Sequence, residues 1–205
     1  MRKKGLIFTI LLFMILMFNV PVGAQISDGE LKADQIKLED ELVVAQENVS
    51  FLYNDGHFTG NNFTYHPEQG DIEMKENLRL EFLDYILTGN LLEGNLEREE
   101  IDVYGDIEIE GEELWATGEE LFYRGPKEEL VLQKQMEVEY IDFWARAESL
   151  TYSLDRQTAF LEGAVEGTRQ GQKFSADNVE IDINNDVVNL KGSASLIFGE
   201  SEETE

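Results

Sequence analysis

Phe174-Ser175-Ala176-Asp177-Asn178-Val179-Glu180-Ile181 is the clearest copy of a pattern that recurs along the chain. A small residue, the anchor of each copy, returns every 27 to 29 residues; a polar residue follows it directly and an apolar residue lies three positions on. The six anchors are Ala33, Gly60, Gly89, Gly118, Ala147 and Ala176. A fixed period of this length predicts one supersecondary unit that is copied and stacked into an elongated fold with a continuous core.

Within each copy, apolar residues alternate with acidic ones, which is the period of a β-strand rather than of a helix. Ile101 and Val103, for example, flank Asp102. Turn residues occur at two places per copy, as in Arg124-Gly125-Pro126-Lys127 and Gln170-Gly171-Gln172. Each copy is therefore expected to form an antiparallel hairpin of two strands, with one apolar and one acidic face.

Glycine also recurs sixteen residues after an anchor, at Gly105, Gly163 and Gly192. Glycine inside a strand marks a bulge or a sharp bend, and bends at one height would fold the sheet along a line. We predict an all-β fold, an antiparallel repeat array that forms an open, bent β-jelly-roll of about twelve or more strands. A β-propeller blade needs about 40 residues and is excluded by the period, whereas a parallel β-helix remains compatible with it.

The first 24 residues are typical of a secretory signal peptide. Arg2, Lys3 and Lys4 precede an apolar run, Leu6 to Val20, and small residues end at Ala24. Cleavage after Ala24 is expected, because the run is short for a bilayer span. The alternative is an uncleaved membrane anchor. The expected organisation is a signal peptide at 1–24, one β-jelly-roll domain of six repeats at 25–198, and a disordered acidic tail at 199–205.

The charge of the chain limits the classes of partner that it can bind. The 43 acidic residues outnumber the 16 basic ones, which gives a formal net charge of −27. Nucleic acid is excluded as a partner, because phosphates would be repelled and no basic patch is available. The chain has no cysteine, so neither a disulfide framework nor a cysteine-based metal site is expected.

The repeats resemble the OstA/LptA family. The resemblance is carried by Phe174–Ile181 followed by Val188-Asn189-Leu190-Lys191-Gly192, and by the related segments Leu31–Leu38, Ala145–Tyr152 and Leu161–Val165. It covers essentially all of residues 26–198. It implies a periplasmic, lipopolysaccharide-binding protein that shelters lipid A acyl chains in an open β-jelly-roll. It also implies copies stacked head to tail between an inner-membrane ABC transporter complex and an outer-membrane receptor.

Residues of the repeat that face inward are the expected lipid-binding positions: Ile36, Leu38, Phe63, Tyr65, Leu92, Leu121, Tyr123, Leu150, Tyr152, Val179 and Ile181. Many of them are also expected to be ordinary core side chains. The first and last strands of an open array leave edges that can pair with another copy. The expected edge residues for oligomer formation are Leu31, Ala33, Ile36, Val188, Leu190 and Leu196.

No catalytic motif, cofactor site or metal site is expected. His57 and His66 lie in or near predicted turns, and Asn184-Asn185-Asp186 lacks the full ligand spacing of a calcium loop. The equivalent residues Trp115 and Trp144 are expected to stack in the core, with a place in a ligand wall as the alternative.

The sequence thus indicates a lipid carrier and bridge protein of the bacterial envelope and not an enzyme. Two alternatives stay open. One is an LptC-like component of the same export system, held in the inner membrane by its first apolar segment. The other is a structural β-repeat that assembles through its edges and carries no cargo.

Overall fold

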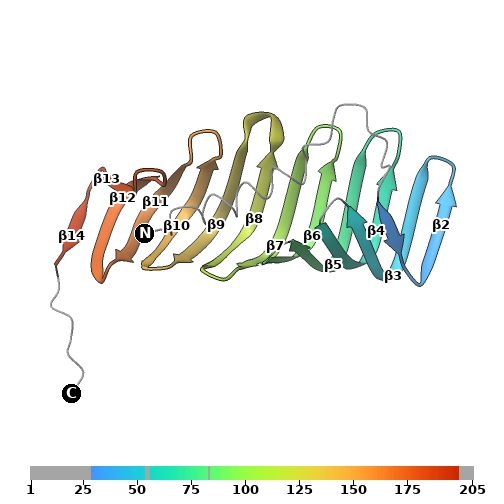
Figure 1. The fold of residues 1–205 in the computed structure, drawn as a ribbon, viewed down its shortest axis with the longest axis horizontal. Helices are drawn as coiled ribbons and strands as arrows, with labels where there is room; N and C mark the ends of the chain where they lie inside the picture. The colour runs from blue at the N-terminus through green and yellow to red at the C-terminus, as the bar shows by residue number, and fades with distance from the viewer. Residues whose placement is uncertain (1–28, 54–55, 83, 199–205) are drawn as a thin grey trace, which may run out of the picture.

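The computed structural model describes residues 29–53, 56–82 and 84–198, and these residues form one antiparallel sheet of fourteen strands (Figure 1). Cleavage after Ala24, and the tail at 199–205, lie outside the described residues. No helix among the described residues is long and apolar enough to cross a membrane. The strands are β1 (Glu30–Lys32), β2 (Gln35–Glu39), β3 (Leu42–Tyr53), β4 (Gly56–His66), β5 (Asp71–Phe82), β6 (Tyr85–Asn95), β7 (Glu100–Glu110), β8 (Leu114–Arg124), β9 (Glu129–Tyr140), β10 (Phe143–Ser153), β11 (Thr158–Arg169), β12 (Gln172–Asp182), β13 (Val187–Lys191) and β14 (Ser195–Ile197).

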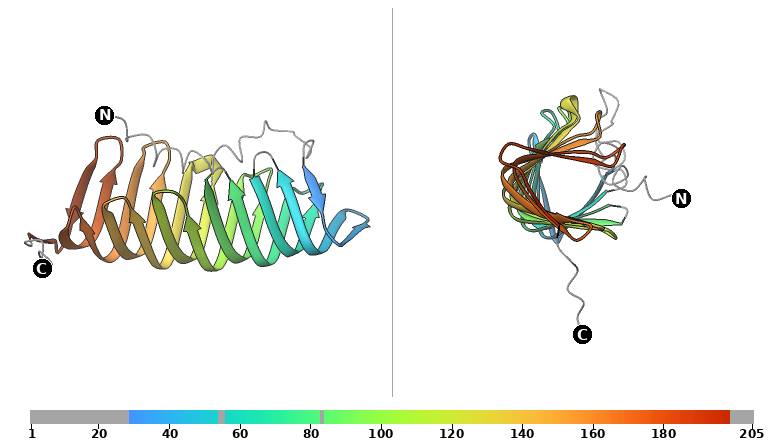
Figure 2. Two further views of the ribbon diagram at one scale, coloured as in Figure 1. Left: turned by 60° about the horizontal axis from the view of Figure 1, so that its bottom comes forward. Right: turned by 90° about the vertical axis from the view of Figure 1, so that its left-hand side faces the viewer.

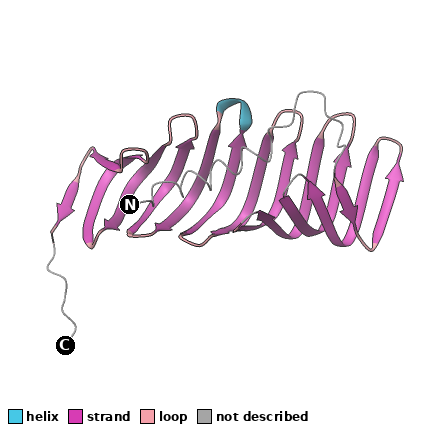
Figure 3. Cartoon of the chain, in the orientation of Figure 1, coloured by secondary structure: helices cyan, strands magenta, loops and turns pink. Residues whose placement is uncertain are grey.

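The sheet follows the chain from one end to the other. From β3 to β12 each strand pairs with the next along the sequence. At the first edge, β1 and β2 pair with the two halves of β3; at the last edge, β13 and β14 pair with the two halves of β12. The predicted antiparallel, open array is confirmed, and the parallel β-helix alternative is wrong. The only helical piece among the described residues is the short 3-10 turn at Gly125–Lys127 (Figure 3).

Each long odd-numbered strand is bent at the position that the glycines predicted. The backbone has positive φ at Gly105 and Gly163, and the register of the ladder shifts at the same places. The residue after an anchor lies over the bend of the next strand: Asn90 Nδ2 donates to Asp106 at 3.3 Å, and the backbone N–H of Ser193 donates to Asp177 at 2.9 Å. Bends stacked at one height fold the sheet into a trough, visible end-on in Figure 2.

The anchors are small because the next strand packs directly on them. A Cβ atom added to Gly60 would lie 2.8 Å from Met74, and one added to Gly89 would lie 2.8 Å from Val103. A Cβ added to Gly118 would meet Leu132 at 2.7 Å. Real Cβ atoms do not approach this closely, so the repeat of small residues records the close packing of strand on strand.

The turns form the two rims of the trough. We call lip A the row of turns that joins β2–β3, β4–β5, β6–β7, β8–β9, β10–β11 and β12–β13. Lip B is the opposite row of described strand ends, where β3 meets β4, β5 meets β6, β7 meets β8, β9 meets β10 and β11 meets β12. Because every long strand runs from one lip to the other and bends midway, each lip edges one of the two walls (Figure 2).

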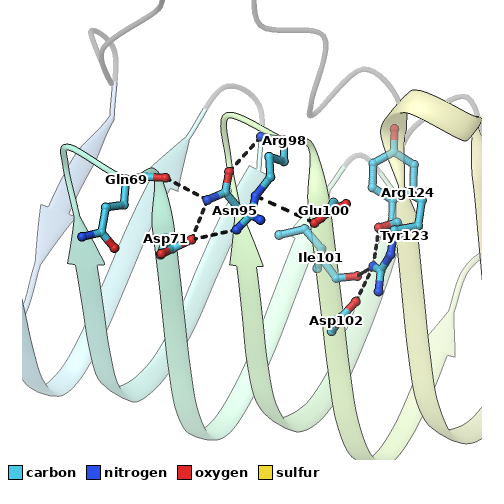
Figure 4. Close-up of polar contacts among 9 residues, drawn as sticks. All are labelled: Gln69, Asp71, Asn95, Arg98, Glu100, Ile101, Asp102, Tyr123 and Arg124. Carbon is cyan, nitrogen blue, oxygen red and sulfur yellow. Dashed lines mark hydrogen bonds and ion pairs between the residues drawn. The ribbon is translucent and has the colours of Figure 1, made fainter.

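Side-chain hydrogen bonds hold the turns of lip A (Figure 4). The buried amide of Asn95 donates to the carbonyl of Gln69 at 2.8 Å and to Asp71 at 2.5 Å, and it accepts from the backbone N–H of Arg98 at 2.8 Å. Asp182 is equivalent to Asn95 in a later copy, and it likewise accepts from the N–H three residues on, at Asn185. Such side-chain caps satisfy turn backbone groups that have no partner in the ladder.

The core lies on the inner face, between the two walls. Its fully buried members include Leu92, Leu121 and Leu161, one from each of three copies. Trp115 and Trp144 lie on the opposite, outer face, where their indole N–H groups donate to Glu108 and Glu137 at 2.9 and 2.5 Å. The expectation that these tryptophans stack in the core is wrong. Their neighbours Ala116 and Ala145 are the buried residues, and side chains alternate along a strand.

Candidate ligand-binding cavity

A cavity of about 440 Å³ lies between the walls and extends from β5 to β13. Its volume is in the range of sites that hold small molecules, about 300–1,000 Å³. The lining is mostly aliphatic and aromatic. It consists of Leu80, Tyr85, Ile86, Leu87, Ile109, Leu114, Ala116, Leu130, Leu132, Val138, Tyr140, Ile141, Asp142, Phe143, Leu150, Tyr152, Ala159, Leu161, Arg169, Gln170, Ile181, Asp182, Ile183, Asp186 and Val188.

The polar lining residues gather at the C-terminal half of the mouth. Asp142, Arg169 and Gln170 belong to lip B, and Asp182 and Asp186 to lip A. Arg169 bridges the lips: its Nη2 donates to Asp186 Oδ1 at 2.6 Å and to the Asp186 carbonyl at 3.3 Å. A ligand in this cavity would therefore have apolar groups inside and polar groups at a rim that carries more carboxylates than cations.

Tyrosines in and beside the cavity are kept neutral by burial. Removal from water raises the pKa of Tyr152, which lines the cavity, to about 12. Burial raises the pKa of the Tyr85 phenol in the same direction, helped by the charges of Asp84, Glu112 and Glu113. Burial disfavours the phenolate because a charge loses hydration in an apolar surrounding. The interior is thus suited to apolar matter and not to charge.

At the N-terminal end the trough is filled by aromatic rings. The ring centroid of Phe51 lies 5.8 Å from that of Phe58 and 5.0 Å from that of Phe63. All three side chains are buried. Phe51 belongs to the lip B half of β3 and Phe63 to the lip A half of β4, so their contact joins the two walls. None of these rings lines the cavity.

The structure distributes the predicted lipid-binding residues over three settings. Leu150, Tyr152 and Ile181 line the cavity. Phe63, Leu92, Leu121, Tyr123 and Val179 are buried in the core without lining it, and Tyr65 packs against the core. Ile36 and Leu38 belong to the edge strand β2, where their side chains are 46% and 79% exposed. Their register partners are Ala45 and Val43, so both lie on the inner face at the open end.

The sequence-based reasoning missed the wall below lip B. Leu87, Leu114 and Phe143 line the cavity from this wall, and they precede the anchor of their copy, whereas all predicted positions follow it. The alternation of apolar residues on both sides of each anchor was the available signal. Once the strand is bent at the anchor, the residues before and after it belong to opposite walls of one interior.

The predicted edge residues lie on the terminal strands or beside them. At the first edge, Leu31 and Ala33 are partly buried against the core. At the last edge, Val188, Leu190 and Leu196 pair with Ile181, Val179 and Phe174, whose side chains are on the inner face. Both ends of the sheet therefore present apolar side chains that continue the interior, including the exposed Leu38 at the first edge and Leu196 at the last.

The histidine and turn residues that were considered as possible metal ligands make hydrogen bonds within the fold. His57 Nε2 lies 2.9 Å from Ser50 Oγ, and Asp182 caps the turn that contains Asn184 and Asn185. Among the residues that the structure describes, no group of three or more histidine or carboxylate side chains could hold a metal ion.

Comparisons with known proteins add a similarity of structure. No family model matches the chain, and no curated protein matches it. The structure is similar to the crystal structure of LptH from Pseudomonas aeruginosa, described as the LptA homologous periplasmic component of the conserved lipopolysaccharide transport device. The match covers 88% of this chain and 100% of that chain, with 10% sequence identity and a TM-score of 0.26. At this identity and TM-score the functional argument rests on the cavity, not on the similarity.

Proposed function

We propose that the protein is a carrier of amphipathic lipid whose acyl chains lie in the cavity while the polar head stays at the mouth. The single observation that carries this proposal is the cavity itself: an apolar interior of about 440 Å³ whose polar lining residues gather at one part of its rim. A binding site of this composition offers mainly hydrophobic burial, so the proposed role is transport and not catalysis.

The energy of such binding suits a carrier. Each methylene group removed from water stabilises the complex by about 0.8 kcal/mol, so about ten methylenes supply about 8 kcal/mol. This figure corresponds to about micromolar affinity before association costs, which weaken the binding further. A ligand held at this strength is retained during transfer and can still be released to a partner.

The finer proposal is a periplasmic bridge component that carries lipopolysaccharide or a similar glycolipid to the outer membrane. Two features support it: the repeats resemble the OstA/LptA family, and both terminal strands expose apolar inner-face side chains, as at Leu38 and Leu196. Its partners would be further copies of the chain, joined by edge-strand pairing, together with an inner-membrane ABC transporter complex and an outer-membrane receptor. Export by residues 1–24 and a 25–198 domain belong to the same proposal.

The experiment is native mass spectrometry of the exported protein with lipid extraction, using a variant whose cavity is filled. Ala159 lines the cavity between Tyr152 and Ile181, its register partners, so Ala159→Trp would place an indole where acyl chains are proposed to lie. Glu162→Trp adds the same bulk to the exposed outer face of β11 and is the matched control. We expect copurified lipid with the wild type and the control, and its loss with Ala159→Trp.

Two outcomes would favour the remaining alternatives. Wild-type protein that is lipid-free in every preparation, and that assembles normally, would replace the carrier with a structural β-repeat joined through its edges. An intact Met1 on the exported protein, found by amino-terminal sequencing, would favour an LptC-like component anchored in the inner membrane.

A further inference from the structure

We propose that Phe51, Phe58 and Phe63 form a floor that closes the cavity at its N-terminal end and limits the length of the acyl chain that the protein accepts. This inference rests on the proposed carrier function and adds a specificity determinant to it. The three residues together are called the aromatic floor below.

The first step is the position of the boundary. Leu80 on β5 lines the cavity, and no residue before it in the described chain does so. Its register partner on the neighbouring strand β4 is Phe58, which is 4% exposed and does not line the cavity. On the wall below lip B, the cavity therefore stops between two directly paired strands, at the first ring of the aromatic floor.

The second step is that the floor spans the trough from wall to wall. Phe58 is paired with Phe51 on β3, and the Phe51 ring lies 5.0 Å from the Phe63 ring of the opposite wall. Phe63 is in turn paired with Met74 on β5, a side chain that is 1% exposed. These contacts join the two walls next to the strand at which the lining of the cavity begins.

The third step is the asymmetry of the two ends. At the other end the lining continues to Val188 on β13, a strand at the last edge of the sheet. An acyl chain inserted from the mouth or from this last edge can extend toward β5 and no further. In a head-to-tail stack, the aromatic floor of one copy would separate its cavity from the terminal strand of its neighbour, so each copy would hold its own ligand.

The test is a chain-length series measured on the full exported chain. Saturated fatty acids that lengthen by two methylene groups per step are titrated against the wild type by competition with a fluorescent fatty acid. Affinity should rise about tenfold per step while the added methylenes are buried, and then level off where the chain end reaches the floor. The length at which the affinity stops rising is the quantity that the variants should move.

Two variants move the floor in opposite directions. Phe51→Ala opens the floor toward β3 and should extend the rise by at least one step, which is a gain of about tenfold for the longest chains. Leu80→Phe extends the floor into the cavity and should end the rise earlier, with a loss of similar size. Phe160→Ala removes a ring from the outer face of β11 and is the control that should leave the series unchanged.

The outcomes separate this inference from the proposed function. If the wild type binds fatty acids and the affinity stops rising at the same length in all four proteins, the floor does not limit the ligand and the inference is wrong. If the affinity of the wild type does not rise with chain length at all, the proposed carrier function is wrong, and the inference about the aromatic floor is wrong with it. Circular dichroism and thermal unfolding confirm that each variant is folded, and Leu80→Phe tests the inference even if Phe51→Ala does not fold.

Discussion

Arg169 and Asp186 join the two lips of the trough, with the guanidinium Nη2 2.6 Å from the carboxylate Oδ1. Arg169 ends β11 at lip B, whereas Asp186 belongs to the lip A turn between β12 and β13. Both residues also line the cavity. Their contact narrows the mouth over the part of the interior that Ile181 and Val188 line, so it stands in the path of a ligand that enters or leaves there.

We predict that Arg169→Gln speeds ligand exchange several-fold and changes stability little. The Asp186 side chain is 73% exposed, and an exposed ion pair contributes at most about 1 kcal/mol to folding. The dissociation rate of a fluorescent fatty acid, measured by stopped flow, should rise, while the thermal midpoint stays close to that of the wild type. Arg146→Gln breaks the Arg146–Glu166 pair within one wall and is the control. Equal dissociation rates in all three proteins would show that the bridge does not restrict the mouth.

The charge of the rim predicts how salt acts on different headgroups. Asp142, Asp182 and Asp186 outnumber Arg169 there, and the arginine is already paired. Binding of an anionic amphiphile should therefore tighten as sodium chloride or magnesium is added, and binding of a cationic amphiphile with the same tail should weaken. Titrations of the two ligands at low and high ionic strength test this. An anionic ligand that binds more weakly at high salt would contradict it.

Glycines at strand bends and glycines at turns should differ in how much stability is lost when they are replaced by alanine. Gly163 and Gly171 both have positive φ, of 87° and 77°, but an added Cβ would meet Glu148 at 2.5 Å only at Gly163. Gly171→Ala should cost about 1 kcal/mol from the backbone alone, and Gly163→Ala about 2–3 kcal/mol. Urea unfolding measures both free energies. Adding Glu148→Ala to Gly163→Ala should recover part of the loss, and equal costs for the two single variants would refute the close packing at the bend.

The sequence predicted the architecture well because the fold is set by local patterns that repeat. The alternation around Val103 predicted strands, and glycine at Gly105 and Gly163 predicted the bends that the backbone dihedral angles confirm. The repetition mattered more than any single copy. Glu76 and Lys134 occupy the same bend position without being glycine, and their backbones still adopt positive φ.

The interior could not be predicted in the same way, because it depends on which wall each residue joins. Leu92 and Leu150 hold equivalent positions, yet only Leu150 lines the cavity. Leu132 and Leu161, the register partners of Leu150, line the cavity with it, whereas Met74 and Val103, the partners of Leu92, do not, and the repeat pattern does not distinguish the two cases. Trp115 shows the converse case, where an apolar residue lies outside because a carboxylate there binds its N–H.

Buried tyrosines predict a loss of stability at alkaline pH. Burial raises the pKa of Tyr152 to about 12 from an ordinary value of 10, so between pH 10 and pH 12 the unfolded chain loses this proton while the folded chain keeps it. The free energy of unfolding then falls with rising pH, by about 1.4 kcal/mol per pH unit for one such group. Tyr152→Phe should reduce the slope of stability against pH by about this amount in that window.

The control for the alkaline experiment is Tyr104→Phe, because Tyr104 lies on the outer face, with its ring centroid 6.0 Å from that of Phe122 and the two rings nearly perpendicular. Desolvation and nearby carboxylates such as Asp102 also raise its pKa, but Tyr104 is less buried, so this variant should flatten the slope less than Tyr152→Phe. Urea unfolding at a series of pH values measures all three slopes. Identical slopes would mean that the Tyr152 phenol is not kept out of water.

The directions in which the backbone N–H groups of β2 point predict at which residue a substitution by proline tests edge pairing. The N–H of Asp34 donates to the carbonyl of Glu47 at 2.9 Å. Hydrogen-bonded pairs alternate with non-bonded pairs along an antiparallel ladder. The N–H of Ile36 therefore also points toward β3, whereas the N–H of Lys37 points away from it. Proline at Ile36 would thus break the ladder of its own chain. Lys37→Pro removes only an outward donor, which an edge strand tolerates.

We therefore expect Lys37→Pro to reduce assembly while the monomer unfolds at nearly the wild-type temperature, and Ile36→Pro to lower both. Light scattering across a concentration series measures assembly, and Lys37→Gln controls for the lost charge. If Lys37→Pro assembles like the wild type, copies do not pair through β2. The exposed inner-face side chains of Ile36 and Leu38 would then have to be covered by a partner that approaches the trough from within rather than along its edge.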